Sequence, residues 1–147
     1  RSNLEKMINI SQINNIEIIS DEKIKDHILK KSIFAVSKSG TISLEICKRK
    51  IPSIIIYKMN FLNFLIVKIL VKIKYANVLN IAAGQMIIPE LLQSKCNPKE
   101  IYKLVSSFLE DQNKIKEQIS NTEKILDSFK TKNLPTDLIA NAIKDRL

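Results

Sequence analysis

The sequence predicts an α/β protein in which a parallel sheet is flanked by helices and followed by a helical C-terminal tail. Two observations support this class. Short apolar runs alternate along the chain with segments whose apolar residues recur at helical spacing. Residues 53–57, Ser-Ile-Ile-Ile-Tyr, are apolar almost throughout, which is typical of a strand buried on both faces of a parallel sheet. In such sheets we expect the ligand at the carboxyl ends of the strands.

The first half of the chain contains three predicted strands separated by two predicted helices. Ser20 and Asp21 are good N-caps, so a helix is expected directly after them. Gly40 allows a tight turn before the second helix, and Pro52 precedes the last strand of this half. In chain order we expect a strand at 16–19, a helix from 21 to about 31, a strand at 33–37, a helix at 41–49 and a strand at 53–57.

The second half is predicted to be mainly helical. Asn97, Pro98 and Glu100 mark a helix start, with Asn97 as N-cap and Pro98 at the first helical position. Pro135 separates the last two predicted helices. In chain order we expect a helix at 61–73, a short strand at 77–79, a short helix at 88–93, a helix at 98–109, a helix at 115–129 and a short helix at 136–147.

The domain organisation expected is one domain at residues 1–130 and a helical tail at 131–147. A length of 147 residues and a hydrophobic content of 45% suit one domain with its own core. The chain lacks an initiating Met and begins at Arg1 within a polar–apolar pattern. We therefore expect a fragment of a longer protein, with the domain incomplete at its N-terminus.

The whole chain has a formal net charge of +9, and its basic residues are concentrated in one interval. No acidic residue lies between Glu45 and Glu90. Codon bias explains extra lysine but not the loss of every Asp and Glu, so we expect an anionic partner: a diphosphate, a phosphorylated lipid or a membrane surface. The basic residues of this interval are Lys48, Arg49, Lys50, Lys58, Lys68, Lys72 and Lys74.

Residues 61–73, FLNFLIVKILVKI, form the most apolar segment. The segment is shorter than the roughly 20 residues that cross a membrane, and lysines interrupt it. One interpretation is a core-facing helix whose lysines reach water. The other is an interfacial helix on anionic lipid, and it predicts membrane contact through Phe61, Phe64, Lys68 and Lys72.

Several functional classes are excluded by composition. Cys47, Cys96 and the single His27 cannot supply the four ligands of a zinc site or a nucleophile paired with a base. We expect buried thiols in a reducing compartment, a surface histidine, no metal and no cofactor. The cations lack interleaved Phe or Tyr along a strand, and no recognition motif is present, so nucleic acid is not an expected partner.

Two segments contain the only glycines, Gly40 and Gly84: KSGTISLE at residues 38–45 and YANVLNIAAGQMIIPELLQ at residues 75–93. The first has the pattern of a strand, a glycine turn and a helix. Such a turn leaves the first N–H groups of the helix free to bind a phosphate.

Four motifs in order, KSGTISLE, PSIIIYK, KILVK and LNIAAGQMIIPELLQ, resemble the lipid-A-disaccharide synthase family. Its C-terminal half typically reads A-S-G-T-x-x-L-E, P-M-V-V-x-Y-R, R-L-V-K and P-N-L-L-A-G-R-E-x-x-P-E-L-L-Q. The resemblance covers roughly residues 16–109. It implies a Rossmann-like, nucleotide-sugar-binding C-terminal half of a GT-B glycosyltransferase. The implied reaction joins UDP-2,3-diacylglucosamine to 2,3-diacylglucosamine 1-phosphate during lipid A biosynthesis.

The resemblance also implies site residues. Ser39, Gly40 and Thr41 match the loop at the nucleotide site, Glu45 an acceptor for ribose hydroxyls, and Asn80 a ligand of the diphosphate-sugar. Taken alone, Ser39 and Thr41 equally suit a helix cap, Asn80 a turn, and Glu90 a favourable charge at a helix N-terminus. The residues expected to bind the UDP-sugar are Ser39, Gly40, Thr41, Glu45, Asn80, Gly84, Gln85 and Glu90.

The chain departs from the family pattern at several positions. Gln85-Met86 replaces Arg-Glu, Lys58 replaces an Arg, and Leu79 replaces a Pro. Lysine does not reproduce the bidentate contacts of arginine. By resemblance, the catalytic base and the acceptor pocket belong to the missing N-terminal half. The catalytic residues are therefore unknown, and the isolated fragment is expected to be inactive.

The resemblance finally implies a location and leaves alternatives. The expected location is the cytoplasmic side of a Gram-negative inner membrane, whose anionic surface the protein binds peripherally. An inactive remnant of the enzyme is one alternative, favoured by Gln85 and Met86. A basic module that binds a membrane surface is another.

Overall fold

The computed structural model describes residues 15–60 and 74–130. By its internal contacts the chain divides into two units, Arg1–Ser32 and Ile33–Leu147. The first unit contains helix α2 (Glu22–Lys31), which begins where predicted because the Asp21 side chain accepts hydrogen bonds from the backbone N–H groups of Lys23 and Ile24. The predicted strand at 16–19 is wrong. A strand needs a neighbour to share its ladder, and none pairs with these residues in the part described.

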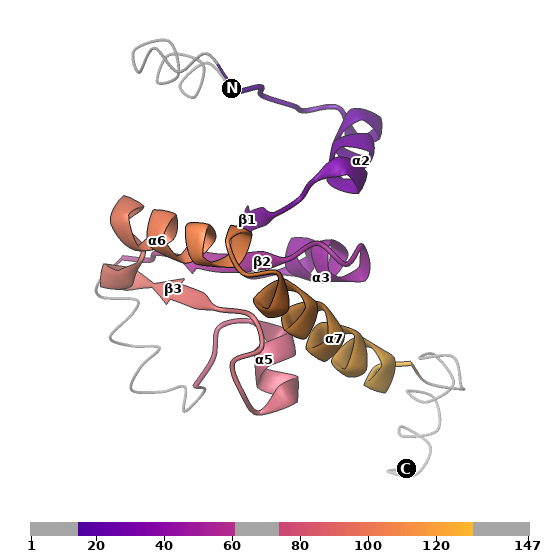
Figure 1. Ribbon diagram of the computed structural model, residues 1–147, viewed down its shortest axis with the longest axis vertical. Coiled ribbons are helices and arrows are strands. Elements are labelled where there is room, and N and C mark those ends of the chain that lie inside the picture. Colours follow the sequence, from indigo (N-terminus) through magenta and orange to yellow (C-terminus); the bar gives the residue numbers. More distant parts are fainter. Residues whose placement is uncertain (1–14, 61–73, 131–147) are drawn as a thin grey trace, which may run out of the picture. The chain divides into compact units, whose positions relative to one another are not determined.

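The second unit contains a parallel sheet in the order β1-β2-β3 (Figure 1). The strands are β1 (Ala35–Ser37), β2 (Ser53–Tyr57) and β3 (Glu90–Leu92). Ser37 lies opposite Ile55, which in turn lies opposite Glu90, so these residues form one row across the sheet. Helix α3 (Thr41–Lys48) connects β1 to β2, and α5 (Val78–Ala83) precedes β3. This arrangement confirms the predicted α/β class with a parallel sheet.

Two helices follow the sheet, as predicted. A short 3₁₀ turn, η1 (Gln93–Lys95), leads to α6 (Pro98–Leu109), and α7 (Gln112–Ser128) comes next. The Asn97 side chain accepts a hydrogen bond from the Glu100 N–H, so the predicted cap of α6 is confirmed. Helix α7 contacts both α3 and α5 (Figure 1).

Helix α7 also supports the amino end of β2. The Gln118 side chain accepts a hydrogen bond from Ser53 N–H at 2.7 Å and donates one to the Ser53 carbonyl at 2.9 Å. Both residues are buried. The side-chain amide thus satisfies the main chain of Ser53 as a neighbouring strand would.

Two predicted elements of the second half are exchanged. Residues 77–79, predicted as a strand, are the start of α5, because the Asn77 side chain accepts from Leu79 N–H and caps a helix that ends at Gly84. The predicted helix at 88–93 is instead β3. Ile88 is fully buried, and a short buried apolar run suits either structure by its periodicity alone.

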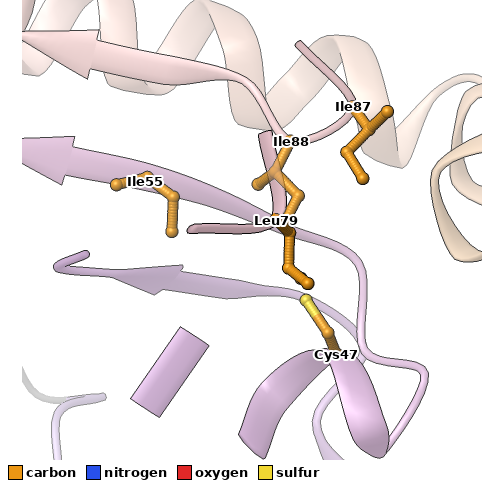
Figure 2. Packing of buried hydrophobic residues seen from close by; sticks show 5 residues of the cluster. All are labelled: Cys47, Ile55, Leu79, Ile87 and Ile88. Atoms are coloured by element: carbon orange, nitrogen blue, oxygen red, sulfur yellow. The ribbon is translucent and has the colours of Figure 1, made fainter. Parts of the chain in front are cut away.

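The core of this unit joins elements from the whole sequence. Figure 2 shows Cys47 of α3, Ile55 of β2 and Leu79 of α5 packed with Ile87 and Ile88, which precede β3. Burial raises the pKa of the Cys47 thiol to about 11, so it is a neutral, buried thiol, as predicted. Cys96 is partly exposed.

Several predictions concern residues outside the described part. The helix at 61–73, with Phe61, Phe64, Lys68 and Lys72, is among them. So is the tail at 131–147, and the boundary after residue 130 stays a prediction. Across 15–60 and 74–130, no helix combines the length and the apolar character that crossing a membrane requires.

Candidate functional site

The candidate site lies at the carboxyl edge of the sheet, where β1 passes into α3. Ser37 ends β1, and α3 begins three residues after Lys38, at Thr41. Gly40 is the N-cap and has a φ of 141°, a backbone conformation that side chains rarely adopt. The strand, glycine turn and helix predicted for this motif are therefore confirmed.

The N-terminus of α3 carries no side-chain cap. In an α-helix the first N–H groups have no intrahelical partner, and the helix dipole gives this end a partial positive charge. Thr41 and Gly40 are exposed, so a ligand can reach this end. The chemistry that fits it is an anion such as a phosphate.

Hydrogen bonds that involve two serines attach the α3 turn to the start of α5. Ser39 Oγ donates to the Ala76 carbonyl at 2.7 Å. Ser43 Oγ donates to the Gly40 carbonyl at 2.6 Å and accepts from Asn77 Nδ2 at 2.9 Å. Segments more than thirty positions apart in sequence thus meet at one edge of the sheet.

Glu90, the first residue of β3, binds the segment before α5. Its buried carboxylate accepts from Ala76 N–H at 2.7 Å, Asn77 N–H at 2.9 Å and Asn80 Nδ2 at 2.7 Å. Hydrogen bonds to a charged acceptor are the stronger kind. We call the connected residues the junction network: Ser39, Gly40, Ser43, Ala76, Asn77, Asn80 and Glu90.

Asn80 faces inward within this network. It is fully buried, and its Oδ1 accepts from Ile87 N–H and Ile88 N–H, both at 2.9 Å. Its Nδ2 also donates to the Ile88 carbonyl at 2.7 Å. These bonds favour a structural role for Asn80 and Glu90 in shaping the approach to β3. A direct role in ligand binding stays a prediction for both.

The other predicted site residues are exposed or partly exposed. Glu45 lies one turn along α3 and pairs with Arg49 at 3.1 Å. Gly84 ends α5 with a φ of 65°, and Gln85 follows it on the surface. A six-residue helix is about 9 Å long, so Gly84 and Gln85 lie at the other end of α5 from Asn77, its N-cap. Of the predicted site residues, Ser39, Gly40, Asn80 and Glu90 belong to the junction network, and Thr41 follows directly after Gly40 as the first residue of α3.

Sequence reasoning missed Ser43 and Asn77 as members of the site. The signal for Asn77 was available, because Asn followed by an apolar run is a common helix start. Ser43 gave no local signal. Its partner is 34 positions away in the sequence, and only the fold brings the two together.

A groove of about 590 Å³ lies elsewhere, against the start of α6. Met86, Leu91, Lys95 and Leu104 are among the residues that line it. It shares Glu90 with the junction network but includes no residue of the Gly40 turn, so it is a separate surface. Within residues 15–60 and 74–130, no group of three or more His, Cys, Asp and Glu residues is placed to hold a metal ion.

Comparisons with known proteins agree on one family. The family model described as lipid-A-disaccharide synthetase matches residues 2–143. Similar proteins include the lipid-A-disaccharide synthases of Rickettsia canadensis, 40% identical over 129 residues, and of Rickettsia felis, 36% identical over 129 residues. The corresponding protein of a Sulfurihydrogenibium species is 43% identical over 96 residues, which is 65% of this chain.

Each alignment covers a larger share of this chain than of the relative. The alignments to both Rickettsia proteins cover 86% of this chain but 33% of each relative. The Sulfurihydrogenibium match covers 25% of that relative. The chain therefore spans about a third of the length of the curated relatives it matches.

Proposed function

This chain belongs to the lipid-A-disaccharide synthase family, and we propose that it is the part of such a glycosyltransferase that binds the UDP-sugar donor. The proposed reaction transfers 2,3-diacylglucosamine from UDP to 2,3-diacylglucosamine 1-phosphate. Such a transfer needs a base for the acceptor hydroxyl and stabilisation of the departing UDP. We assign the second task to this chain. The base and the acceptor pocket are assigned to the part of the relatives that this chain does not cover.

The observation that carries the proposal is the junction of the two glycine-containing segments at the carboxyl edge of the sheet. Ser39 and Ser43 attach the α3 turn to Ala76 and Asn77. This fixes the open N-terminus of α3 where parallel sheets bind their ligands. A departing UDP carries its charge on a diphosphate, and the N–H groups of a fixed helix end stabilise that charge without rearranging.

The site residues receive different roles in this proposal. Gly40 and Thr41 contact the diphosphate through the backbone, and Ser39 holds the turn. Glu45, one turn further along α3, accepts hydrogen bonds from the ribose hydroxyls. Asn80 and Glu90 hold the start of α5 in place, and Gly84 and Gln85 approach the sugar. The proposed reaction uses no cofactor or metal ion.

The wider setting is also proposed. Both substrates carry acyl chains, so the enzyme works at the cytoplasmic surface of the inner membrane, to which residues 61–73 bind peripherally through Phe61, Phe64, Lys68 and Lys72. The fold proposed for the whole enzyme is GT-B. An inactive remnant, which Gln85 and Met86 favour, and a basic membrane-surface module stay predictions.

Amide NMR of the full 147-residue chain tests the proposal. Addition of UDP should shift the signals of residues 38–45 and 75–80, because the ligand lies against the α3 turn and the segment bonded to it. The same shifts should occur in EDTA, since no metal ion is involved. Shifts confined to the groove beside α6, or an absolute need for Mg²⁺, would refute this site.

A further inference from the structure

Two lysines at the candidate site each lie over a tyrosine ring. Lys38 Nζ is 4.9 Å from the centroid of the Tyr57 ring, and Lys74 Nζ is 5.5 Å from that of Tyr75. Both distances are within the roughly 6 Å at which a cation is attracted to the face of an aromatic ring. Lys74 belongs to the basic interval between Glu45 and Glu90, whereas Lys38 precedes that interval.

The two pairs flank the hydrogen bond that joins the glycine-containing segments. Lys38 immediately precedes Ser39, whose Oγ donates to the Ala76 carbonyl, and Lys74-Tyr75 immediately precedes Ala76. Tyr57 is the last residue of β2, the strand next to β1. The hydrogen bond between Ser39 and Ala76 therefore brings the main chain beside both lysines to the same edge of the sheet.

Neither cation is neutralised by a carboxylate in the described ranges. Both lysines are exposed, and no ion pair there includes either of them. The carboxylates of the two segments have partners other than these lysines. Glu45 pairs with Arg49, and Glu90 is buried among the N–H donors of the junction network.

We propose that Lys38 and Lys74 form a cationic clamp for the diphosphate of the ligand, an extension that rests on the proposed function. A lysine ammonium has three N–H donors. The ring holds one side of each ammonium and limits its conformational freedom, and the remaining donors face away from the ring. A diphosphate offers oxygens on two linked phosphorus atoms, so it can accept from both lysines at once. A single phosphate has fewer oxygens to share between them.

Calorimetric titration of the full chain at low ionic strength tests the clamp, with UDP, ADP, UMP, uridine and inorganic pyrophosphate as probes. Lys38→Ala and Lys74→Ala should each weaken binding of UDP and pyrophosphate by about 3- to 10-fold, the loss expected for one typical hydrogen bond at an exposed site. Uridine binding should stay unchanged. Tyr57→Phe keeps the ring and should bind as the unchanged protein does, whereas Tyr57→Leu should resemble Lys38→Ala.

The control variant is Lys103→Ala, which removes an exposed lysine of α6 and should leave binding unchanged. Urea unfolding of each variant checks that the fold is kept. Unchanged UDP binding in both lysine variants would overturn the clamp and leave the donor site standing. Equal losses for UDP and uridine would also overturn it, because the lysines would then contact the nucleoside.

The same titrations separate the clamp from the proposed function. If pyrophosphate binds in a Lys38-dependent manner while UDP binds no better than ADP, the clamp stands and the assignment to a UDP-sugar fails. If the unchanged chain binds neither pyrophosphate nor UDP, both are overturned.

Discussion

The two glycine-containing segments each include one glycine with a positive φ, but they differ in how their polar groups are used. In the first, residues 38–45, the start of α3 has no side-chain cap, and Thr41 is exposed. In the second, residues 75–93, Asn77 caps α5 while Asn80 and Glu90 are buried and bonded. The difference supports our proposal that the first segment meets the diphosphate and that the start of the second segment holds the first in place.

Among substitutions that test this difference between the segments, Glu90→Ala should have the largest effect on stability. Removing the carboxylate leaves Ala76 N–H, Asn77 N–H and Asn80 Nδ2 without their acceptor in a buried place. The free energy of unfolding should fall by about 3–5 kcal/mol, the cost of uncompensated buried polar groups. Urea unfolding measures it.

The matched control is Glu117→Ala on the exposed side of α7, which should change stability little. A Glu90→Ala protein as stable as this control would show that the second segment is not a support.

A smaller effect is expected where the two segments share the core, at Cys47 of α3 beside Leu79 of α5. Burial raises the pKa of this thiol from 9.0 to about 11 in the folded state. Between these values the unfolded chain loses the proton first, so stability falls as pH rises from about 9 to 11. The loss should approach about 2–3 kcal/mol.

Unfolding curves measured at intervals from pH 8 to 11 test this pH dependence. Cys47→Ala should be less stable at pH 8, because it leaves a cavity, but its stability should decline less steeply as pH rises. If both proteins show the same slope, Cys47 does not titrate as a buried thiol.

The smallest effect on stability, and the sharpest comparison, comes from the glycines themselves. Gly40 and Gly84 both have positive φ angles, and a Cβ at either would meet no atom within 4 Å. Gly40→Ala and Gly84→Ala should therefore each cost about 1 kcal/mol through backbone strain alone. Since only Gly40 is at the open end of α3, only Gly40→Ala should also weaken UDP binding.

Denaturant unfolding and UDP titration are measured for both variants, and each variant is the control for the other. Equal losses of UDP binding would mean that both segments contact the ligand, and the division between binding and support would then be wrong.

The sequence predicted those elements whose signals are local. Helix caps at Asp21 and Asn97 determined where α2 and α6 begin, and the apolar run at residues 53–57 identified β2. The prediction assigned a strand where α5 begins and a helix where β3 lies, because a short buried apolar run has no period that separates helix from strand. The glycine turn was found because a single residue type marks it.

The junction network was not predictable in the same way. Glu90 looked like a charge at a helix N-terminus, and its real partners are the N–H groups of Ala76 and Asn77, more than ten positions earlier. The bond from Ser39 to Ala76 spans 37 positions. Such pairs follow from the register of the sheet, which the sequence of either segment alone does not contain.

The contact between Gln118 and Ser53 has a consequence for the order in which the chain matures during synthesis. The two residues are 65 positions apart, so the ribosome completes the sheet strands well before it adds the side chain that satisfies the start of β2. Until then the Ser53 peptide and the core face covered by Ile125 and Leu126 stay open to water. Because loop closure over this distance is a late step, we expect the nascent domain to become resistant to proteases only after α7 has emerged.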